Sequence, residues 1–278
     1  MQPTYTAEAE AYREKVQAFL AEKLPSNWQG IGALQGEELE TFVTEWRNVL
    51  YEANYLAPGW PTAFGGSGLS ATEQVILAEE FTKAGVPTGG PNDAFSIQML
   101  GNTILMWGTD EQKAHYIPRI LSGEDVWCQG YSEPDAGSDL GNVGLKAELD
   151  GDEWVLNGQK IWTSAGHLAD HIFTLARTDP DSPKHKGISF LLVPMDQPGI
   201  EVRPIKMISG DSEFNEVFYT DARCPKDNVI GGVNNGWGVA MSLLGYERGE
   251  AAATGPIRFK AEYQRLEAMA KERGLTDD

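Results

Sequence analysis

Up to about residue 124, the apolar residues recur every three or four positions, the period of one face of an α-helix. Ser70 with Glu73 and Thr109 with Gln112 match the capping-box pattern that opens helices, and Gly123 follows the last periodic residue. The pattern predicts helices over residues 6–24, 39–50, 70–83, 92–107 and 110–122. We therefore expect an all-helical N-terminal domain over residues 1–124.

The pattern changes near Val126, where short runs rich in Val, Ile, Phe and Trp alternate with turns. Hairpin signals stand at Asp150–Asp152 and at Asn157-Gly158. The predicted strands are residues 126–131, 143–149, 153–157, 159–163, 171–177, 188–194, 200–207 and 214–220. This number of strands predicts a β-barrel or β-sandwich as the middle domain, over residues 125–232.

A helical period returns after residue 232, where Trp237, Met241 and Leu244 share one face. Gly255-Pro256 is expected to break or kink this helix, and a charged helix is expected over residues 257–273. Residues 233–278 then form the start of a C-terminal helical domain. The predicted fold class is α+β, with helical, β and helical segments in that order.

The chain is acidic, with 41 acidic and 22 basic residues and a formal charge of −19. No basic stripe offsets this charge, so nucleic acid and anionic membrane surfaces are unsuitable partners. The two cysteines and four histidines show neither a disulfide framework nor metal-ligand spacing. No stretch is long and apolar enough to span a bilayer, and the first residues do not form a signal or transit peptide, so a cytoplasmic location is expected.

Two stretches carry candidate chemistry. Residues 129–139, Gln-Gly-Tyr-Ser-Glu-Pro-Asp-Ala-Gly-Ser-Asp, form a turn of small and polar residues whose backbone can approach a ligand closely. Residues 158–166, Gly-Gln-Lys-Ile-Trp-Thr-Ser-Ala-Gly, place an indole and several hydroxyls on the next strand. Taken alone, such a stretch is more often an ordinary Pro/Gly loop than a ligand site.

Together, in this order, the two stretches resemble the flavin-binding segments of the acyl-CoA dehydrogenases. Supporting matches run from Ala57-Pro-Gly-Trp-Pro to Gly245-Tyr-Glu-Arg248, so the resemblance covers nearly the whole chain. It implies FAD as cofactor and removal of an α-proton and a β-hydride from an acyl-CoA thioester. The family also continues into a C-terminal helical bundle, most of which this chain lacks.

The resemblance assigns cofactor contacts residue by residue. It places Tyr131 and Ser132 at the pyrimidine edge of the flavin, Trp162 over one face of the ring, and Ser164 near N5. Ser138 falls where a serine contacts the pyrophosphate and the substrate. The remaining cofactor-binding residues implied by the two motifs are Gln129, where many members have Tyr or Phe, Gly137 and Thr163.

The catalytic base is implied by the Glu-Arg pair on the first helix after the β-domain, its place in the isovaleryl and long-chain types. Here that residue is Glu247, with Glu250 as the alternative on an adjacent face. Arg248 matches an arginine that helps hold the substrate, and Gly245 lies where the CoA channel is lined, often by an aspartate. Read without the resemblance, Glu247 is a solvated helix carboxylate.

Three functions remain open at this stage. The first is an acyl-CoA dehydrogenase that passes electrons to an acceptor such as an electron-transfer flavoprotein. The second is a flavin oxidase or hydroxylase of the same fold. The third is a non-catalytic or half-site subunit that needs a partner, and a homo- or hetero-oligomer is expected in each case.

Overall fold

The computed structural model describes residues 5–247 and 249–275, with the side chains of residues 247, 249–254, 258 and 261 left undescribed. The chain divides into two compact units. One contains residues up to Gly90 together with those from Glu247 onward, and the other spans Pro91–Tyr246. Each unit is described by itself below.

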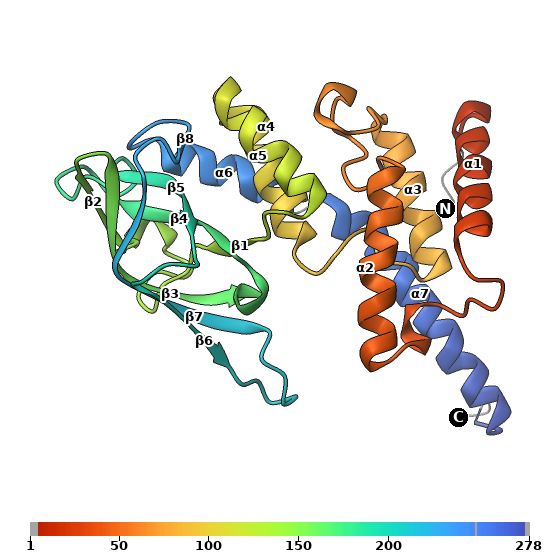
Figure 1. The fold of residues 1–278 in the computed structure, drawn as a ribbon. Coiled ribbons are helices and arrows are strands. Elements are labelled where there is room, and N and C mark those ends of the chain that lie inside the picture. The colour runs from red at the N-terminus through yellow and green to blue at the C-terminus, as the bar shows by residue number, and fades with distance from the viewer. Residues whose placement is uncertain (1–4, 248, 276–278) are drawn as a thin grey trace. The chain divides into compact units, whose positions relative to one another are not determined.

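The first unit is helical (Figure 1). Thr6 caps its first helix through a hydrogen bond from Ala9 N, and the predicted capping box at Ser70 and Glu73 is present. Trp46, Leu50 and Phe81 are almost fully buried, so the aromatic stripe of the second helix packs in the core as expected for an amphipathic helix. The helices are α1 (Ala7–Lys23), α2 (Gly36–Glu52), α3 (Ala71–Ala84) and α7 (Gly249–Glu272), with α7 packed along α3.

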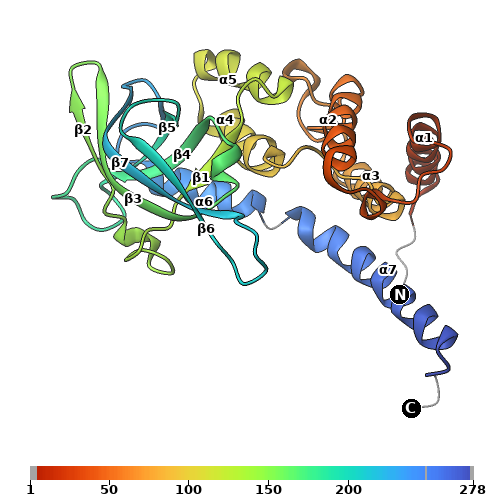
Figure 2. The ribbon, with the colours of Figure 1, turned by 60° about the horizontal axis from the view of Figure 1, so that its bottom comes forward.

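The second unit is built on one mixed sheet of eight strands, with the order β6-β7-β3-β2-β4-β5-β8 and with β1 paired to β4 in parallel (Figure 2). The strands are β1 (Trp127–Gly130), β2 (Lys146–Asp150), β3 (Glu153–Ser164), β4 (His171–Arg177), β5 (Ile188–Pro194), β6 (Ile200–Ile205), β7 (Phe214–Pro225) and β8 (Val229–Ile230). The predicted sandwich-like β-domain is therefore confirmed.

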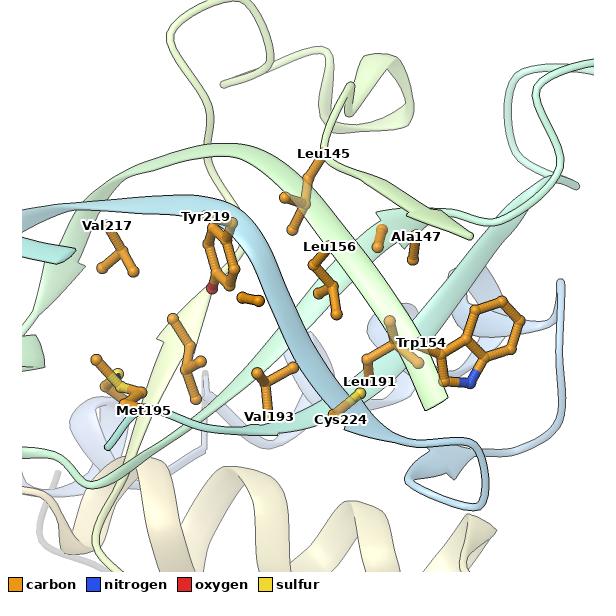
Figure 3. Close-up of a cluster of buried hydrophobic side chains, with 14 residues drawn as sticks. Leu145, Ala147, Trp154, Leu156, Leu191, Val193, Met195, Val217, Tyr219 and Cys224 are labelled. Carbon is orange, nitrogen blue, oxygen red and sulfur yellow. Dashed lines mark hydrogen bonds between the residues drawn. The ribbon is translucent and has the colours of Figure 1, made fainter. Parts of the chain in front are cut away.

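The sheet encloses its own apolar core (Figure 3). Alternate residues of β3 and β7 point into it, because successive side chains of a strand face opposite sides. Leu156, Leu191 and Val217 are fully buried there, beside the two free cysteines, Cys128 and Cys224. Burial of this kind contributes about 25 cal/mol per Å² of apolar surface, so this core is a main source of the sheet's stability.

Helices complete the second unit. Thr109 and Gln112 form the predicted capping box of α5 (Asp110–Ser122), which Gly123 ends in the left-handed region. The stretch expected as a single helix over 92–107 is instead a π-helix over Ala94–Gly101 followed by α4 (Asn102–Trp107). The last helix is α6 (Gly236–Glu247), and its first residue lies so close to the backbone of Ser189 that a Cβ there would be 2.4 Å from the Ser189 carbonyl carbon.

Two expected breaks are wrong. Asn157-Gly158 is not a hairpin turn, because β3 continues through it with a register shift against β7 between Leu156 and Gly158. Gly158 has a φ of +149°, and a Cβ there would lie 3.0 Å from the Leu145 Cα, so the glycine marks a bulge and a close approach rather than a turn. The expected break at Gly255-Pro256 is also wrong, because α7 runs through Pro256, whereas the alternative of a kink there stays a prediction.

Other differences concern strand ends. β7 extends to Pro225, five residues beyond the predicted limit, and β8 was not predicted because it has only two residues. The hairpin at Asp150–Asp152 is confirmed by the pairing of Asp150 with Glu153. Within the described residues, none of the helices combines the length and apolar character that a membrane crossing requires.

Candidate functional site

The candidate site begins where β1 ends, at the loop of residues 131–145. Gly130, the last residue of β1, packs closely against β4. A Cβ at this position would lie 2.7 Å from Ile172 Cδ1 on that strand. Thr174 Oγ1 also donates to the Gly130 carbonyl at 2.7 Å. The loop therefore leaves the sheet from a fixed point.

The loop turns tightly at residues 133–136, where Glu133 and Ala136 exchange backbone hydrogen bonds of 3.0 and 3.1 Å. Gly137 and Ser138 follow and are exposed. Among the described residues, no heavy atom outside its chain neighbours would lie within 4 Å of a Cβ on Gly137, and its φ is not in the left-handed region. The fold therefore does not require glycine at 137, whereas a ligand that approaches the backbone would.

The second candidate stretch is the end of β3. Its register against β7 shifts between Lys160 and Thr163, and Trp162 in this bulge has a φ of +62°. A left-handed backbone is costly for a bulky residue and persists only where the surroundings impose it. The Trp162 side chain is 57% exposed, with one edge against Phe214, so an indole face is available to a planar ligand.

A backbone hydrogen bond joins the two stretches. Ile161 N donates to the Ser132 carbonyl oxygen at 2.9 Å, which brings Tyr131 and Ser132 beside the strand that carries Trp162. Tyr131 is buried, and its ring packs edge-on against Phe173. Ser132 and Ser164 are half-buried, whereas Ser138 is exposed.

Several buried polar atoms have no hydrogen-bond partner among the described residues, and two of them are next to the candidate motifs. They are Nε2 of Gln129, on β1, and Oγ1 of Thr163, next to Trp162. A buried donor left unsatisfied costs about 1–3 kcal/mol, so native structures seldom keep one without reason. A bound polar ligand can satisfy such atoms. With the opening at Gly137 and the exposed indole of Trp162, the donor set fits a cofactor that is both aromatic and rich in hydrogen-bonding groups.

The π-helix lies against this site and was not foreseen in the sequence. Ser96 Oγ accepts a hydrogen bond from Trp127 N at 3.0 Å. Asn92, just before the π-helix, donates to the Trp127 carbonyl at 3.0 Å and to the Ala165 carbonyl at 3.4 Å. Segments of π-helix are frequent at functional sites, so this segment is a further candidate part of the site.

Sequence reasoning also missed two supporting side chains, Lys160 and Asn215. Asn215 on β7 donates to the Thr163 carbonyl at 2.9 Å. Lys160 is fully buried on β3 and pairs with Glu133. A signal for Lys160 existed, since it continues the alternation of the buried residues Trp154 and Leu156 along the strand.

The substrate side of the site is only partly described. Gly245 is exposed on α6, and a Cβ there would meet no atom within 4 Å among the described residues. Arg248 and the side chains of Glu247 and Glu250 lie outside the described residues. No group of His, Cys, Asp and Glu in the part of the chain that the structure describes could hold a metal ion.

Comparisons with known proteins agree with these features. Residues 6–124 match the model of the acyl-CoA dehydrogenase N-terminal domain, and residues 128–222 match that of the acyl-CoA dehydrogenase middle domain. The acyl-CoA dehydrogenase IpdE1 of Mycobacterium tuberculosis is 42% identical over 98% of this chain and 71% of its own length. The mitochondrial isovaleryl-CoA dehydrogenase of Pongo abelii is 33% identical over 88% of this chain and 57% of its own length.

Solved structures show the same relationship. The structure titled "Tcur3481-Tcur3483 steroid ACAD" superimposes with a TM-score of 0.82 and 36% identity, over 100% of this chain and 71% of that one. The ChsE4-ChsE5 complex from Mycobacterium tuberculosis gives a TM-score of 0.70 and 35% identity, over 89% of this chain and 62% of that one. The two family models together match most of the chain, and the relatives align along nearly all of it. The chain therefore belongs to the acyl-CoA dehydrogenases.

Proposed function

We propose that this chain binds FAD between the loop of residues 129–138 and the end of β3, and that it oxidises an acyl-CoA thioester across its Cα–Cβ bond. The observation that carries the proposal is Trp162, an indole 57% exposed on a left-handed backbone beside that loop. The partnerless Nε2 of Gln129 and Oγ1 of Thr163 support it, because an isoalloxazine ring offers several hydrogen-bonding groups.

Each residue of the site has a proposed task. Tyr131 and Ser132 hold the pyrimidine edge of the flavin, and Trp162 covers one face of the ring. Ser164 approaches N5 through its hydroxyl. Ser138, which is exposed on the loop after Gly137, contacts the pyrophosphate and the substrate. When bound, FAD supplies the two-electron acceptor for the β-hydrogen.

Glu247 is the proposed base for the α-proton, with Arg248 holding the substrate beside it. The support is its position in Gly245-Tyr-Glu-Arg248, at the end of α6. A thioester α-proton is far less acidic than a carboxylic acid, so the base needs a site from which water is excluded. Such a site raises the pKa of the carboxylate and strengthens hydrogen bonds to the thioester carbonyl.

A bulky, steroid-derived acyl group is the proposed substrate class. The solved structure titled as a steroid acyl-CoA dehydrogenase aligns over the whole of this chain at 36% identity, whereas the isovaleryl enzyme aligns over 88% at 33%. The π-helix at residues 94–101 supports this choice, because a wider helix changes which side chains line the neighbouring pocket. Assembly with a second chain is also proposed, since the ChsE4-ChsE5 relative is a complex.

The test is a visible absorption spectrum of the purified chain with FAD, followed by anaerobic addition of steroid-derived, branched and straight-chain acyl-CoA esters. We expect a flavin band that bleaches fastest with the steroid-derived ester. Glu247→Gln should keep the flavin band and slow bleaching by about 10²- to 10⁴-fold, the usual contribution of a general base. A chain that binds no FAD, alone or as purified with a partner, overturns the proposal, and bleaching that Glu247→Gln leaves unchanged moves the base elsewhere.

A further inference from the structure

Lys160 is a lysine with no exposed surface, in the middle of the candidate cofactor site. Its side chain is 0% exposed, and its ammonium lies 2.7 Å from Oε1 of Glu133, whose side chain is 9% exposed. Lysine is almost never fully buried unless it is paired. Lys160 also donates to the Tyr131 carbonyl oxygen at 3.1 Å. Both contacts of its ammonium are therefore with the loop of residues 131–145.

Glu133 connects this ammonium to the other end of the loop. Its Oε2 accepts from Gly144 N at 2.6 Å, and its Oε1 accepts from Leu145 N at 2.9 Å. One carboxylate thus joins residues 133, 144, 145 and 160 in a single network. The loop that carries Gly137 and Ser138 is closed at its base by this carboxylate and is held to β3 by Lys160.

The two charges lie between the two flavin motifs. Tyr131 and Ser132 immediately precede Glu133, and Trp162 lies two residues after Lys160 on the same strand. The backbone bond from Ile161 N to the Ser132 carbonyl, 2.9 Å long, runs beside the ion pair. The ion pair therefore lies next to Ser132 in the loop and two residues from Trp162 on β3.

Stability alone does not account for this pair. Taking two charges out of water is expensive, and replacement of a buried ion pair by uncharged residues of similar volume is often neutral or stabilising. Burial lowers the pKa of the Lys160 ammonium to about 8, because desolvation disfavours the charged form more than the neighbouring Glu133 carboxylate favours it. The contacts that the pair makes with both ends of the loop offer a second reason for it, which is the geometry it imposes.

We propose that Lys160 and Glu133 are positioning residues that set the flavin site before the cofactor enters. Lys160 holds the Tyr131 carbonyl against β3, and Glu133 closes the base of the loop at Gly144 and Leu145. The loop is therefore already ordered beside Trp162 when the cofactor binds. This inference rests on the proposed FAD function. Preorganisation of this kind raises affinity by removing the cost of ordering the loop during binding.

The experiment compares Glu133→Gln, Lys160→Met and the double variant with the full-length wild type. The stability of each protein is measured by urea unfolding. In a separate experiment on the folded protein, the FAD dissociation constant is measured by the quenching of flavin fluorescence. The single variants each leave one charge buried and unpaired, so we expect both stability and FAD affinity to fall. The double variant removes both charges and should recover the urea midpoint of the wild type, yet bind FAD at least tenfold more weakly.

Recovery of stability without recovery of affinity supports a positioning role. A double variant with the wild-type midpoint and the wild-type dissociation constant overturns it, as does a double variant that stays unstable, because the pair is then structural. A second readout is the shape of the bound flavin band, which should lose its resolved shoulder in the double variant. A wild type that binds no FAD refutes the proposed function and this inference together, whereas equal binding by wild type and double variant refutes only this inference.

The matched control is Arg223→Gln. Arg223 pairs with Glu153 at 3.0 Å and Asp150 at 3.1 Å on the same sheet, but this ion pair is exposed and far along the strands from Trp162. Removal of an exposed pair has little effect on stability. We expect Arg223→Gln to match the wild type in both urea midpoint and FAD dissociation constant.

Discussion

The side-chain amide of Asn92 donates a hydrogen bond to the main-chain carbonyl of Trp127 at 3.0 Å, with both groups buried. Through the same nitrogen, Asn92 reaches the Ala165 carbonyl at 3.4 Å, just beyond the end of β3. Asn92 therefore holds two segments together, the strand that leads into the loop of residues 131–145 and the turn that follows Ser164. The position of the candidate site is set from outside the sheet as well as from within it.

Asn92→Ala should lower the free energy of unfolding by about 1–3 kcal/mol, because it removes the donor to the buried Trp127 carbonyl and to the partly buried Ala165 carbonyl. Urea unfolding followed by tryptophan fluorescence measures this loss. Asn157→Ala is the control, since Asn157 is exposed although it bonds to Asp221 at 2.9 Å. Equal losses in the two variants would show that the Asn92 bonds contribute no more than a surface contact.

Gly137→Ala should separate folding from cofactor binding. A Cβ at 137 meets no described atom within 4 Å, so the free energy of unfolding should change by less than about 0.5 kcal/mol. If the FAD pyrophosphate approaches the backbone here, the added methyl should weaken FAD binding about tenfold, or about 1.4 kcal/mol. Gly32→Ala, also in open space, is the control and should change neither quantity. Undiminished FAD affinity in Gly137→Ala would place the cofactor elsewhere.

Trp162→Gly should also keep the protein stable while it loses the cofactor. Glycine accepts the φ of +62° without strain, and the lost side chain is more than half exposed, so the unfolding free energy should stay within about 1 kcal/mol of the wild type. FAD should bind much more weakly, and Trp162→Phe should retain part of the affinity because it keeps an aromatic face. Flavin fluorescence titration measures both, and a large loss of stability in Trp162→Gly would show that the indole serves the core.

Lys160 should make stability depend on alkaline pH. Burial lowers its pKa to about 8 in the folded chain, whereas the unfolded chain keeps the proton up to about pH 10.4. Between these values the unfolded state binds more protons, so the free energy of unfolding rises with pH. Relative to Lys160→Met, which lacks the titrating group, the wild type should gain stability between about pH 8 and about pH 10.4. A difference that does not vary over this range would contradict the prediction.

Cys128 and Cys224 should be inert in the folded protein. Burial raises the pKa of the Cys128 thiol far above its usual value and that of Cys224 to about 12, so neither forms the reactive thiolate near pH 8. Ellman's reagent should give almost no colour with the native protein at that pH and should detect both thiols after unfolding. Rapid labelling of the native protein would show that the core in Figure 3 opens readily.

The sequence pattern predicted the elements whose signals are local. The capping boxes at Ser70 and Thr109 and the hairpin at Asp150 depend on a few adjacent residues, and all are confirmed. Gly158 was misread because a glycine after asparagine indicates a turn locally, whereas the bulge depends on the approach of Leu145 from another strand. The π-helix was missed for a different reason. In a stretch that is apolar on nearly all sides, the periodicity of the sequence does not distinguish a π-helix from an α-helix.

The site was predicted in part for a related reason. Motifs identified the loop at Tyr131 and the strand at Trp162, and the structure joins them through Ile161 N and the Ser132 carbonyl. The assigned tasks of the individual site residues remain predictions. The roles of Lys160 and Asn92 could not be read from sequence, because a charged or amide side chain reveals its purpose only when its buried partners are known.

The parallel pairing of β1 with β4 determines when the loop of residues 131–145 can form during folding. Trp127 pairs with His171, so the loop and the whole of β2 and β3 lie between the two paired strands. Bringing together segments so distant in sequence carries a loop-closure entropy that local hairpins avoid, and such contacts form slowly. The hairpin of β2 and β3 can form first, but the start of the loop at Gly130 is fixed only once β4 is in place. In the nascent chain, the start of this loop is therefore fixed only after β2, β3 and β4 have been synthesised.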